Sequence, residues 1–398
     1  MEPIRLQENG PSFDARFDDT VAAALLSSRL VGVEPRGNGW FTLIPGARVG
    51  MVRIETGSRS VEVRVQPKVG IARLLFLLGY LADPGWQDED IDIGDAEDLL
   101  PAVIDALGRA ATLALRPGVL QGYRTVEEAL PVVRGRLLMG AQMTRQFGLP
   151  LPVEVRYDEY DADIAENQIL LAACHLGLSV PRLRDDTRVQ LLHVMSRLDG
   201  VSSLPRRALL PPWRPSRLNR RYDGALRLAE LILRHASIEE TGNADDVTTA
   251  GFVVSMWKVF EDFVTITLAE AMSGTPGTTH PQFAINLDQD RLVRMCPDLV
   301  HQRHGEPVLV VDAKYKAERH AGYPNADAYQ MLAYCTALRL DRGHLIYAQG
   351  NERPRVYDIE AAGVLITAHA LDLSGTPAEL LHRIRNLATE LLASAVQG

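Results

Sequence analysis

The C-terminal third of the chain carries an order of patterns that restricts the fold more than any other feature. Apolar residues recur with helical spacing in two segments and with strand-like spacing in four. The order is a helix, three strands, a helix and a closing strand, at residues 253–271, 281–288, 291–302, 308–316, 325–340 and 343–349. This alternation predicts a compact α/β unit.

The third strand, "VLVVDAKYK", runs from an apolar segment directly into charge. Asp312, Lys314 and Lys316 are two residues apart, so a strand places them on one face. The chain has only four lysines, and the other two are Lys68 and Lys258. An ammonium is a compact point charge, whereas the guanidinium used elsewhere in this chain is a planar fork. The pattern therefore indicates a need for an ammonium at this strand end.

A second carboxylate is expected beside this strand. Asp298 lies in a Pro-Asp dipeptide on the preceding strand, and antiparallel pairing would bring it within reach of Asp312. Two carboxylates beside a lysine form the oxygen-lined kind of site that Mg²⁺ occupies. Lys314 would orient a water and stabilise charge on a phosphoryl group. The Asp-x-Lys triplet alone favours a surface salt bridge, whereas the full order of elements favours a nuclease site.

Further candidates are less specific. Glu261, between two phenylalanines on the first helix, would reach the metal together with Asp298 and Asp312, or be a half-exposed helix acid. Gln330 and Tyr334 share a helix face and would contact the metal site or the DNA backbone, or only pack. Three histidines are expected to be surface or turn residues: His301, His304 and His344.

The first two thirds of the chain divide into a β-rich part and a helical part. Short alternating segments predict antiparallel strands, followed by a helix from Ile71, in the ranges 40–44, 51–57, 61–67 and 71–81. Helical patterns follow at 99–115, 164–178, 186–198 and 222–236. Two long loops are expected among them, one running from "VVRGRLL" (132–138) to "YDEYDADIAEN" (157–167) and one being "RRALLPPWRPSRLNRRY" (206–222).

The second of these loops holds six arginines with Trp213 and Tyr222 interleaved. Such a segment can follow a phosphate backbone, or it can pair with acids of a neighbouring domain. The candidate nucleic-acid contacts are Arg217, Arg220 and Arg221, with Lys316 and Tyr334 at the strand and helix.

Composition sets the remaining limits. With 398 residues, 46% of them hydrophobic, two or three domains are expected. The three cysteines are far apart and predict packing residues in a reducing compartment rather than a disulfide or zinc site. A net charge of −9 requires that any DNA contact use local basic patches. The acidic run at 83–98 reads as a solvated loop, the apolar run at 74–82 is too short to span a membrane, and a cytoplasmic protein is expected.

Seven segments, taken in order, resemble the McrC family, the endonuclease subunit of the McrBC modified-cytosine restriction system. They are "VEVRVQPKVG", "VVRGRLL", "YDEYDADIAEN", "RLNRRY", "WKVFEDFV", "PDLV" with "VVDAKYK", and "YQMLAYC". The core is similar to the PD-(D/E)xK nucleases, with Asp298, Asp312 and Lys314 matching their motif. Glu261 matches the helix acid, and Gln330 with Tyr334 matches a Q-x-x-x-Y helix of some branches.

The resemblance implies an α+β multidomain protein. Residues 1–125 would form a β-rich domain that docks on the partner, residues 126–240 a mainly helical connection, and residues 241–398 the nuclease. The implied partner is a hexameric McrB-like AAA+ GTPase, which recognises and translocates methylated double-stranded DNA and is stimulated by this subunit. The chain itself has no phosphate-loop motif, which agrees with a cutting subunit that binds no nucleotide. The implied cofactor is Mg²⁺, with Mn²⁺ as a substitute.

Two other interpretations remain open from the residues. The chain would be a non-cleaving assembly and GTPase-activating factor if the metal site were vestigial, and the intact Asp298, Asp312 and Lys314 speak against this. It would be a nuclease that needs no motor if it read DNA by itself, and the absence of a recognisable DNA-reading module speaks against that.

Overall fold

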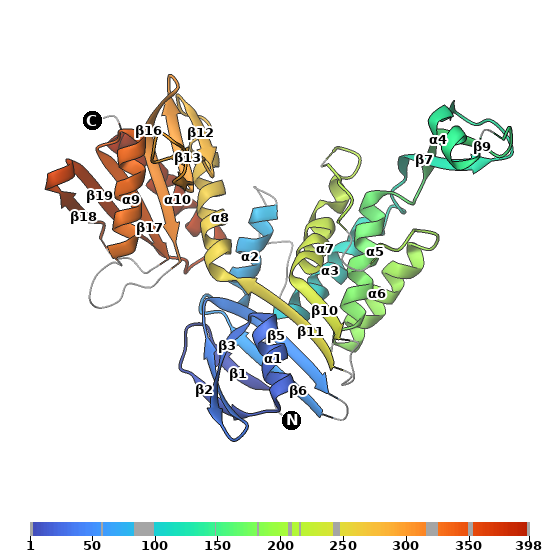
Figure 1. The fold of residues 1–398 in the computed structure, drawn as a ribbon, viewed down its shortest axis with the longest axis horizontal. Coiled ribbons are helices and arrows are strands. Elements are labelled where there is room, and N and C mark those ends of the chain that lie inside the picture. Colours follow the sequence, from blue (N-terminus) through green and yellow to red (C-terminus); the bar gives the residue numbers. More distant parts are fainter. Residues whose placement is uncertain are drawn as a thin grey trace. The chain divides into compact units, whose positions relative to one another are not determined.

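The computed structural model describes most of the chain, and its described part forms two compact units (Figure 1). The described residues are 3–56, 59–82, 99–147, 149–180, 183–205, 209–214, 216–241, 247–315, 325–348 and 353–395. The first unit combines the residues up to 82 with those from 237 onward, and the second holds residues 100–236. The acidic run at 83–98 and Lys316 lie outside the described residues. The chain is of mixed α and β structure, and the predicted functional ranges 1–125, 126–240 and 241–398 stay predictions.

The N-terminal part of the first unit contains two sheets. A five-stranded sheet has the order β1-β6-β5-β11-β10, with bounds Ile4–Gln7, Arg59–Gln66, Arg48–Thr56, Val247–Ser255 and Ala236–Thr241. A three-stranded sheet has the order β2-β4-β3, with bounds Phe13–Arg16, Trp40–Pro45 and Val31–Gly37. Two helices accompany them, α1 (Asp19–Ser28) and α2 (Ile71–Ala82). The predicted strands and the helix from Ile71 are confirmed.

Strand β6 is buried on both faces, which its alternating sequence does not suggest. Val61, Val63 and Val65 fill one face, as period-two alternation predicts. Glu62 and Arg64 on the other face are also buried, and the Arg64 Nε donates to Glu62 Oε1 at 2.6 Å. Pairing of the two charges makes their burial tolerable.

The C-terminal part of the first unit is a six-stranded sheet, coloured orange to red in Figure 1. Its order is β12-β15-β16-β17-β19-β18, with bounds Thr278–Pro281, Leu299–Arg303, Glu306–Lys314, Arg342–Ala348, Val364–Leu371 and Arg355–Ile359. A small hairpin joins β13 (Ile285–Asn286) to β14 (Arg294–Met295). The helices are α8 (Met256–Ala271), α9 (Asn325–Leu338) and α10 (Pro377–Ser394), with a short 3₁₀ turn at Glu360–Ala362.

Three sequence predictions for this region were wrong. The first helix begins at Met256 rather than 253, because residues 247–255 pair with β5 as strand β11. The segments expected as single strands at 281–288 and 291–302 each contain two short strands. Strand β17 does not close the sheet, because β19 pairs with it in parallel on its far side.

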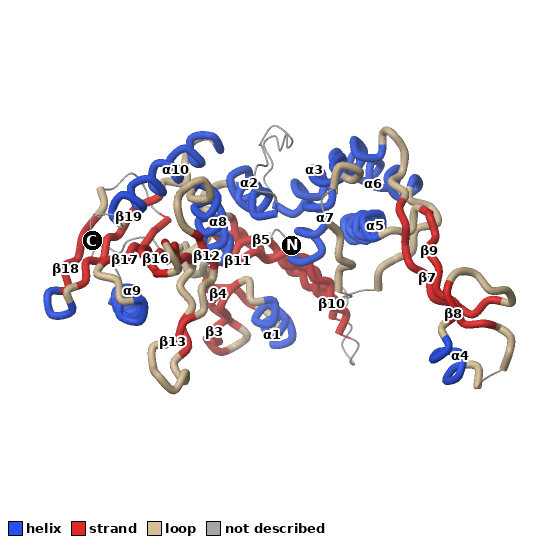
Figure 2. Tube along the Cα trace, turned by 90° about the horizontal axis from the view of Figure 1, so that it is seen from above, coloured by secondary structure: helices blue, strands red, loops and turns tan. Residues whose placement is uncertain are grey.

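Helices cover the two faces of the six-stranded sheet. Viewed from above, the sheet lies between α9 on one side and α8 with α10 on the other (Figure 2). Met331, Tyr334 and Cys335 of α9 pack on a buried cluster that includes Val310 and Leu345. Since side chains alternate along β16, the face of Val310 is also that of Asp312 and Lys314. The site residues therefore continue the apolar face that α9 covers.

A glycine allows α9 to approach β17 closely. A Cβ built at Gly343 would lie 2.4 Å from Met331 Sδ and 2.7 Å from Cys335 Sγ. We expect Gly343→Ala to lower the free energy of unfolding by about 1–3 kcal/mol through overpacking. Urea denaturation of this variant would check the value. Gly363 also has open space around it, but its positive φ makes Gly363→Ala unsuitable as a control. Gly140→Ala, where a Cβ meets nothing, is the matched control, and equal stability of all proteins would contradict the packing argument.

The second unit contains the predicted helices together with a sheet that the sequence did not predict. The helices are α3 (Leu99–Leu115), α5 (Ala165–Leu178), α6 (Asp185–Arg197) and α7 (Asp223–His235), preceded by a 3₁₀ turn at Arg220–Tyr222. Antiparallel strands of order β7-β9-β8, with bounds Gly122–Leu130, Val153–Asp161 and Arg136–Leu137, carry the short helix α4 (Met139–Arg145). We call residues 122–161 the arm, since they extend away from the helices of this unit (Figures 1 and 2). The first expected loop thus contains β8, α4 and β9.

Two further expectations concern buried residues. Cys174 and Cys335 are buried as predicted, but Cys296 is exposed, so the prediction that all three cysteines pack was wrong. His301 and His344 are buried rather than on the surface, because hydrogen bonds to Thr279 and His369 satisfy their rings. No helix in the described part of the chain combines the length and apolarity that crossing a bilayer requires.

Candidate active site

The site lies where β16 ends beside the residue that precedes β15. The antiparallel register pairs Leu299 with Val311. Continuing this register by one residue places Asp298 opposite Asp312. Both carboxylates are buried, with 8% of Asp298 and 2% of Asp312 exposed. The structure therefore brings together the two acids that the sequence predicted from adjacent strands.

Hydrogen bonds hold Asp298 in place. Its Oδ2 accepts from the backbone N–H of Ala313 at 2.8 Å, and its Oδ1 accepts from Gln282 Nε2 at 3.0 Å. The backbone N–H of Gln282 also donates to the Asp298 carbonyl. Burial raises the pKa of Asp298, against the lowering effects of the Ala313 N–H and the Lys314 charge. Sequence reasoning missed Gln282, because a glutamine in a strand-like segment carries no signal of its own.

Asp312 and Lys314 form a nearly buried ion pair. Lys314 Nζ lies 2.5 Å from Asp312 Oδ2, without the angle of a well-formed hydrogen bond. Burial, followed by the charge of Asp298, raises the pKa of Asp312 to about 6, although Lys314 opposes the shift. Burial alone would lower the pKa of Lys314, but the charges of Asp312, Asp298 and Glu261 outweigh it and the pKa is raised. The lysine stays charged among acids that resist ionisation.

Glu261, on the first turns of α8, belongs to the same electrostatic cluster. Burial raises the pKa of Glu261 to about 7, with the charge of Asp298 adding to the shift and Lys314 opposing it. Nevertheless, among the residues that the structure describes, no three His, Cys, Asp or Glu side chains converge as a metal site. The geometry thus offers two close carboxylates, and a metal role for Glu261 stays a prediction.

Helix α9 adds a tyrosine and a glutamine to the edge of the cluster. Gln330 Nε2 donates to the Tyr334 hydroxyl at 2.7 Å, so the two residues predicted to share a face do so. Gln330 is exposed, whereas Tyr334 is buried and its pKa is raised by burial and by the charges of Asp312 and Asp298. Asp327, one turn before Gln330, is also buried and accepts from the Tyr347 hydroxyl at 3.1 Å. Its helical spacing from Gln330 was the signal that sequence reasoning passed over.

The shifted carboxylates predict a pH-dependent affinity for Mg²⁺. Metal binding requires ionised carboxylates, and raised pKa values keep Asp312 and Glu261 protonated to higher pH than usual. We expect the affinity for Mg²⁺ to rise by about tenfold per pH unit from about pH 5.5 up to these pKa values of about 6 and 7, and to level off above them. Calorimetric titration with Mg²⁺ across this range checks the expectation. An affinity that is constant with pH would contradict the assigned protonation states.

The arginine-rich segment lies in the second unit. Arg217, Arg220 and Arg221 are all exposed, while Asn219 and Tyr222 of the same segment are buried. Asn219 Nδ2 donates to Glu166 Oε1 at 2.9 Å, and the Tyr222 hydroxyl accepts from the backbone N–H of Leu120. These two buried residues therefore anchor the segment and leave the arginines on the surface. Their contact with nucleic acid stays a prediction, as does that of Lys316.

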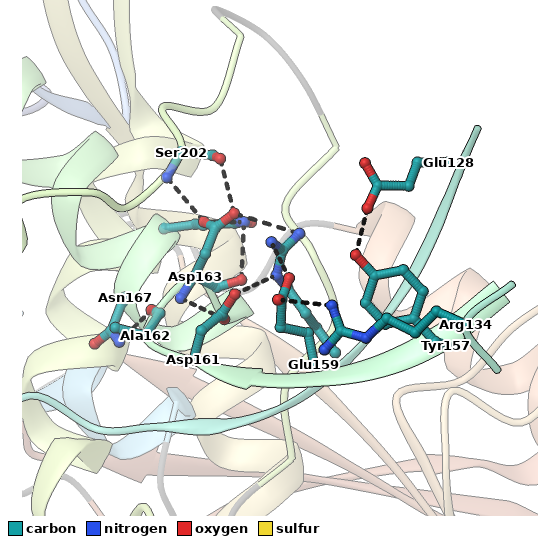
Figure 3. Close-up of polar contacts among 11 residues, drawn as sticks. Glu128, Arg134, Tyr157, Glu159, Asp161, Ala162, Asp163, Asn167 and Ser202 are labelled. Carbon is teal, nitrogen blue, oxygen red and sulfur yellow. Dashed lines mark hydrogen bonds and ion pairs between the residues drawn. The ribbon is translucent and has the colours of Figure 1, made fainter. Parts of the chain in front are cut away.

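The segment "YDEYDADIAEN" builds the base of the arm rather than a site (Figure 3). Arg124 Nε lies 2.9 Å from Asp161 Oδ2, and Asp163 accepts from the Ser202 backbone N–H and hydroxyl, each at 2.8 Å. The guanidinium of Arg134 stacks 3.9 Å above the Tyr157 ring. Asn167 Nδ2 donates to the carbonyls of Leu120 and Ala162. The acids of this motif thus form hydrogen bonds and ion pairs within the protein.

Comparison with known proteins places the chain in a family. A sequence model described as "McrBC 5-methylcytosine restriction system component" matches residues 45–348, which is more than half of the chain. The chain belongs to this family. The resemblance drawn from the seven segments is confirmed for this McrBC family member, whereas no curated protein matches it significantly in sequence.

A solved structure supports the same fold for the McrBC family member. A refined half-complex from the tetradecameric assembly of Thermococcus gammatolerans McrB AAA+ hexamers with bound McrC contains a chain with TM-score 0.60 and 17% identity. The alignment covers 98% of this chain and 100% of that one. A cryo-EM structure of the Thermococcus gammatolerans McrBC complex gives a TM-score of 0.40 at 19% identity, covering 69% and 89%. Only the first likeness is close enough to show a shared fold.

Proposed function

We propose that this McrBC component is the DNA-cutting subunit, a Mg²⁺-dependent endonuclease that hydrolyses phosphodiester bonds when an AAA+ GTPase partner drives it. The observation that carries the proposal is the meeting of Asp298, Asp312 and Lys314 at the end of β16. A buried pair of acids with raised pKa values is costly for folding, and such groups are concentrated at functional sites.

The donor set suits a magnesium ion. Mg²⁺ takes one or two protein carboxylates and completes its shell with waters and substrate phosphate oxygens, so Asp298 and Asp312 suffice. When bound, the ion supplies Lewis-acid polarisation of the phosphoryl group and a more acidic water. Lys314 would place its ammonium beside the reacting phosphate and stabilise the developing negative charge. Mn²⁺ would substitute, since it prefers the same oxygen ligands.

The partner is proposed to be a McrB-like AAA+ hexamer, which would supply GTP hydrolysis and recognition of methylated DNA. The McrB hexamers bound to McrC in the related assembly support this choice. Residues 1–125 are the docking part implied by the resemblance. The remaining candidate contacts, Gln330 and Tyr334 at the site and the exposed arginines of the second unit, would act on the DNA backbone.

The arm offers a second surface for this partner. Its segment between β7 and β9 exposes seven apolar residues, each between 59% and 86% accessible: Val132, Val133, Met139, Met143, Phe147, Leu149 and Leu151. Such patches mark sites of protein association. We expect the double substitution Met143→Asp with Phe147→Asp to abolish stimulation of the partner's GTPase while the chain stays folded. Wild-type stimulation by this variant would remove the arm from the interface.

The alternative is a non-cleaving assembly and GTPase-activating factor. One experiment separates the two functions: methylated and unmethylated plasmids are incubated with Mg²⁺ and this chain, with or without its AAA+ partner and GTP. Cutting only in the full mixture supports the proposal, and cutting by the chain alone indicates a nuclease that needs no motor. Stimulated GTP hydrolysis without cutting in any mixture would establish the assembly factor.

A further inference from the structure

The residue that follows Lys314 is held by a segment from the other end of the chain. Tyr315 donates its hydroxyl hydrogen to Glu8 Oε2 at 3.1 Å. Its ring packs against Phe260 of α8, with 5.7 Å between the ring centroids. Side chains alternate along the strand, so Tyr315 occupies the face opposite to Lys314. The strand end is therefore fixed from the side away from the carboxylates.

Glu8 is an unusual residue to find at this place. It is fully buried, its Oε1 has no hydrogen-bond partner among the described residues, and burial raises its pKa. Its Oε2 accepts from the backbone N–H of Lys68 at 3.1 Å as well as from Tyr315. A buried carboxyl group with an unsatisfied oxygen destabilises a fold. Its presence points to a task other than stability.

Three segments of the sequence meet at this point. Glu8 follows β1, and its N–H donates to the Gln66 carbonyl at the end of β6. Lys68 belongs to the "QPKVG" turn, and Phe260 precedes the acid Glu261 on α8. Tyr315 and Phe260 are thus the direct neighbours of two members of the charged cluster, and Glu8 ties this pair to the N-terminal sheet.

We propose that Glu8 is a positioning residue for the candidate active site, acting through Tyr315 to fix the Lys314 ammonium against Asp312. The expected effect on DNA cleavage rests on the proposed function, whereas the contact between Glu8 and Tyr315 does not. Because Glu8 is carried by the N-terminal sheet, the arrangement of that sheet sets where Lys314 lies. A displacement of about 1 Å at a catalytic group is enough to lower a rate by about a hundredfold.

The variants that test the role separate the hydrogen bond from the charge and the volume. Tyr315→Phe keeps the ring on Phe260 and removes only the hydroxyl, and Glu8→Ala removes the acceptor. Glu8→Gln keeps an acceptor oxygen and should rescue. Glu306→Gln, at the exposed start of the same strand, is the matched control. In the full mixture we expect kcat to fall about tenfold to a hundredfold in the first two variants, with KM for DNA unchanged.

A double-mutant cycle adds a readout that a merely structural role would not move. If Glu8 and Tyr315 act as one unit, Glu8→Ala combined with Tyr315→Phe lowers kcat no further than either change alone. Independent damage to the fold would instead give rate losses that multiply, and a parallel loss of GTPase stimulation. Multiplying losses would overturn the proposal.

The scarcity of lysine provides a test that needs no cleavage. The full chain is acetylated, and the acetylation rate of each lysine is measured by mass spectrometry. The side chain of Lys314 is 15% exposed, and Lys258, whose side chain is 62% exposed, serves as the internal standard. We expect Lys314 to react several-fold faster, relative to Lys258, in Tyr315→Phe and Glu8→Ala than in the wild type and Glu8→Gln. Unchanged Lys314 rates would overturn the proposal. If the wild type cuts in no mixture, the proposed function fails, and these rates still decide the positioning role.

Discussion

Replacing Lys314 with alanine is expected to lower the DNA-cleavage rate of the full mixture by about a hundredfold to a thousandfold. The Lys314 ammonium lies 2.5 Å from Asp312 Oδ2 and is nearly buried, so no other described side chain is placed to take over its charge at that position. Stimulation of the partner's GTPase should be retained, because the substitution leaves the surfaces proposed for docking unchanged. Plasmid cleavage and phosphate release, measured on the same samples, give both values.

Two matched variants make this first expectation specific. Lys258→Ala removes an exposed lysine that pairs with Asp262 on α8, and cleavage should stay at the wild-type rate. Lys314→Arg keeps the charge, but a planar guanidinium does not fit a space shaped for a compact ammonium, so we expect cleavage to be lost here too. Full cleavage by Lys314→Ala would show that the chemistry does not use this residue, and the active-site assignment would then be wrong.

Replacing Asp312 with asparagine is expected to abolish cleavage and, in the absence of divalent metal, to make the folded chain more stable. The carboxylate is 2% exposed, and burial with the nearby Asp298 charge raises its pKa to about 6. The rise from the ordinary value of 3.8 already includes the opposing charge of Lys314, and we expect a gain of about 1–3 kcal/mol at pH 7.5. Thermal unfolding in EDTA measures it.

The pH dependence of this gain fixes its cause. Because the pKa of Asp312 is higher in the folded state, the folded chain binds more protons than the unfolded one between about pH 4 and 6. Stability contributed by the protonated carboxyl is present at low pH and is lost as the pH rises through this window. The stability difference between wild type and Asp312→Asn should thus be small near pH 4 and constant above about pH 7. A gain from Asp358→Asn, an exposed acid of the same sheet, would point to net charge instead.

The sequence alone determined the local elements and the identity of the charged cluster. Alternation in β5 and β6, helical spacing in α2, α3, α5 and α9, and the strand leading into Asp312 and Lys314 are local patterns set by side chains a few residues apart. Pairing of Asp298 with Asp312 could also be predicted, since adjacent strands with a short turn between them have few registers available.

Only the tertiary structure decided which distant segments meet. No local pattern shows that residues 253–255 leave the expected helix and join residues 247–252 in a strand that pairs with β5, because a short apolar run suits a helix and a strand equally well. The acids of "YDEYDADIAEN" contact Arg124 and Ser202, partners that the segment itself does not reveal. Likewise, Glu8 and Tyr315 are 307 positions apart, and their hydrogen bond depends on the packing of whole sheets. Contacts of this kind depend on how complete elements pack, which residues close together in the sequence do not specify.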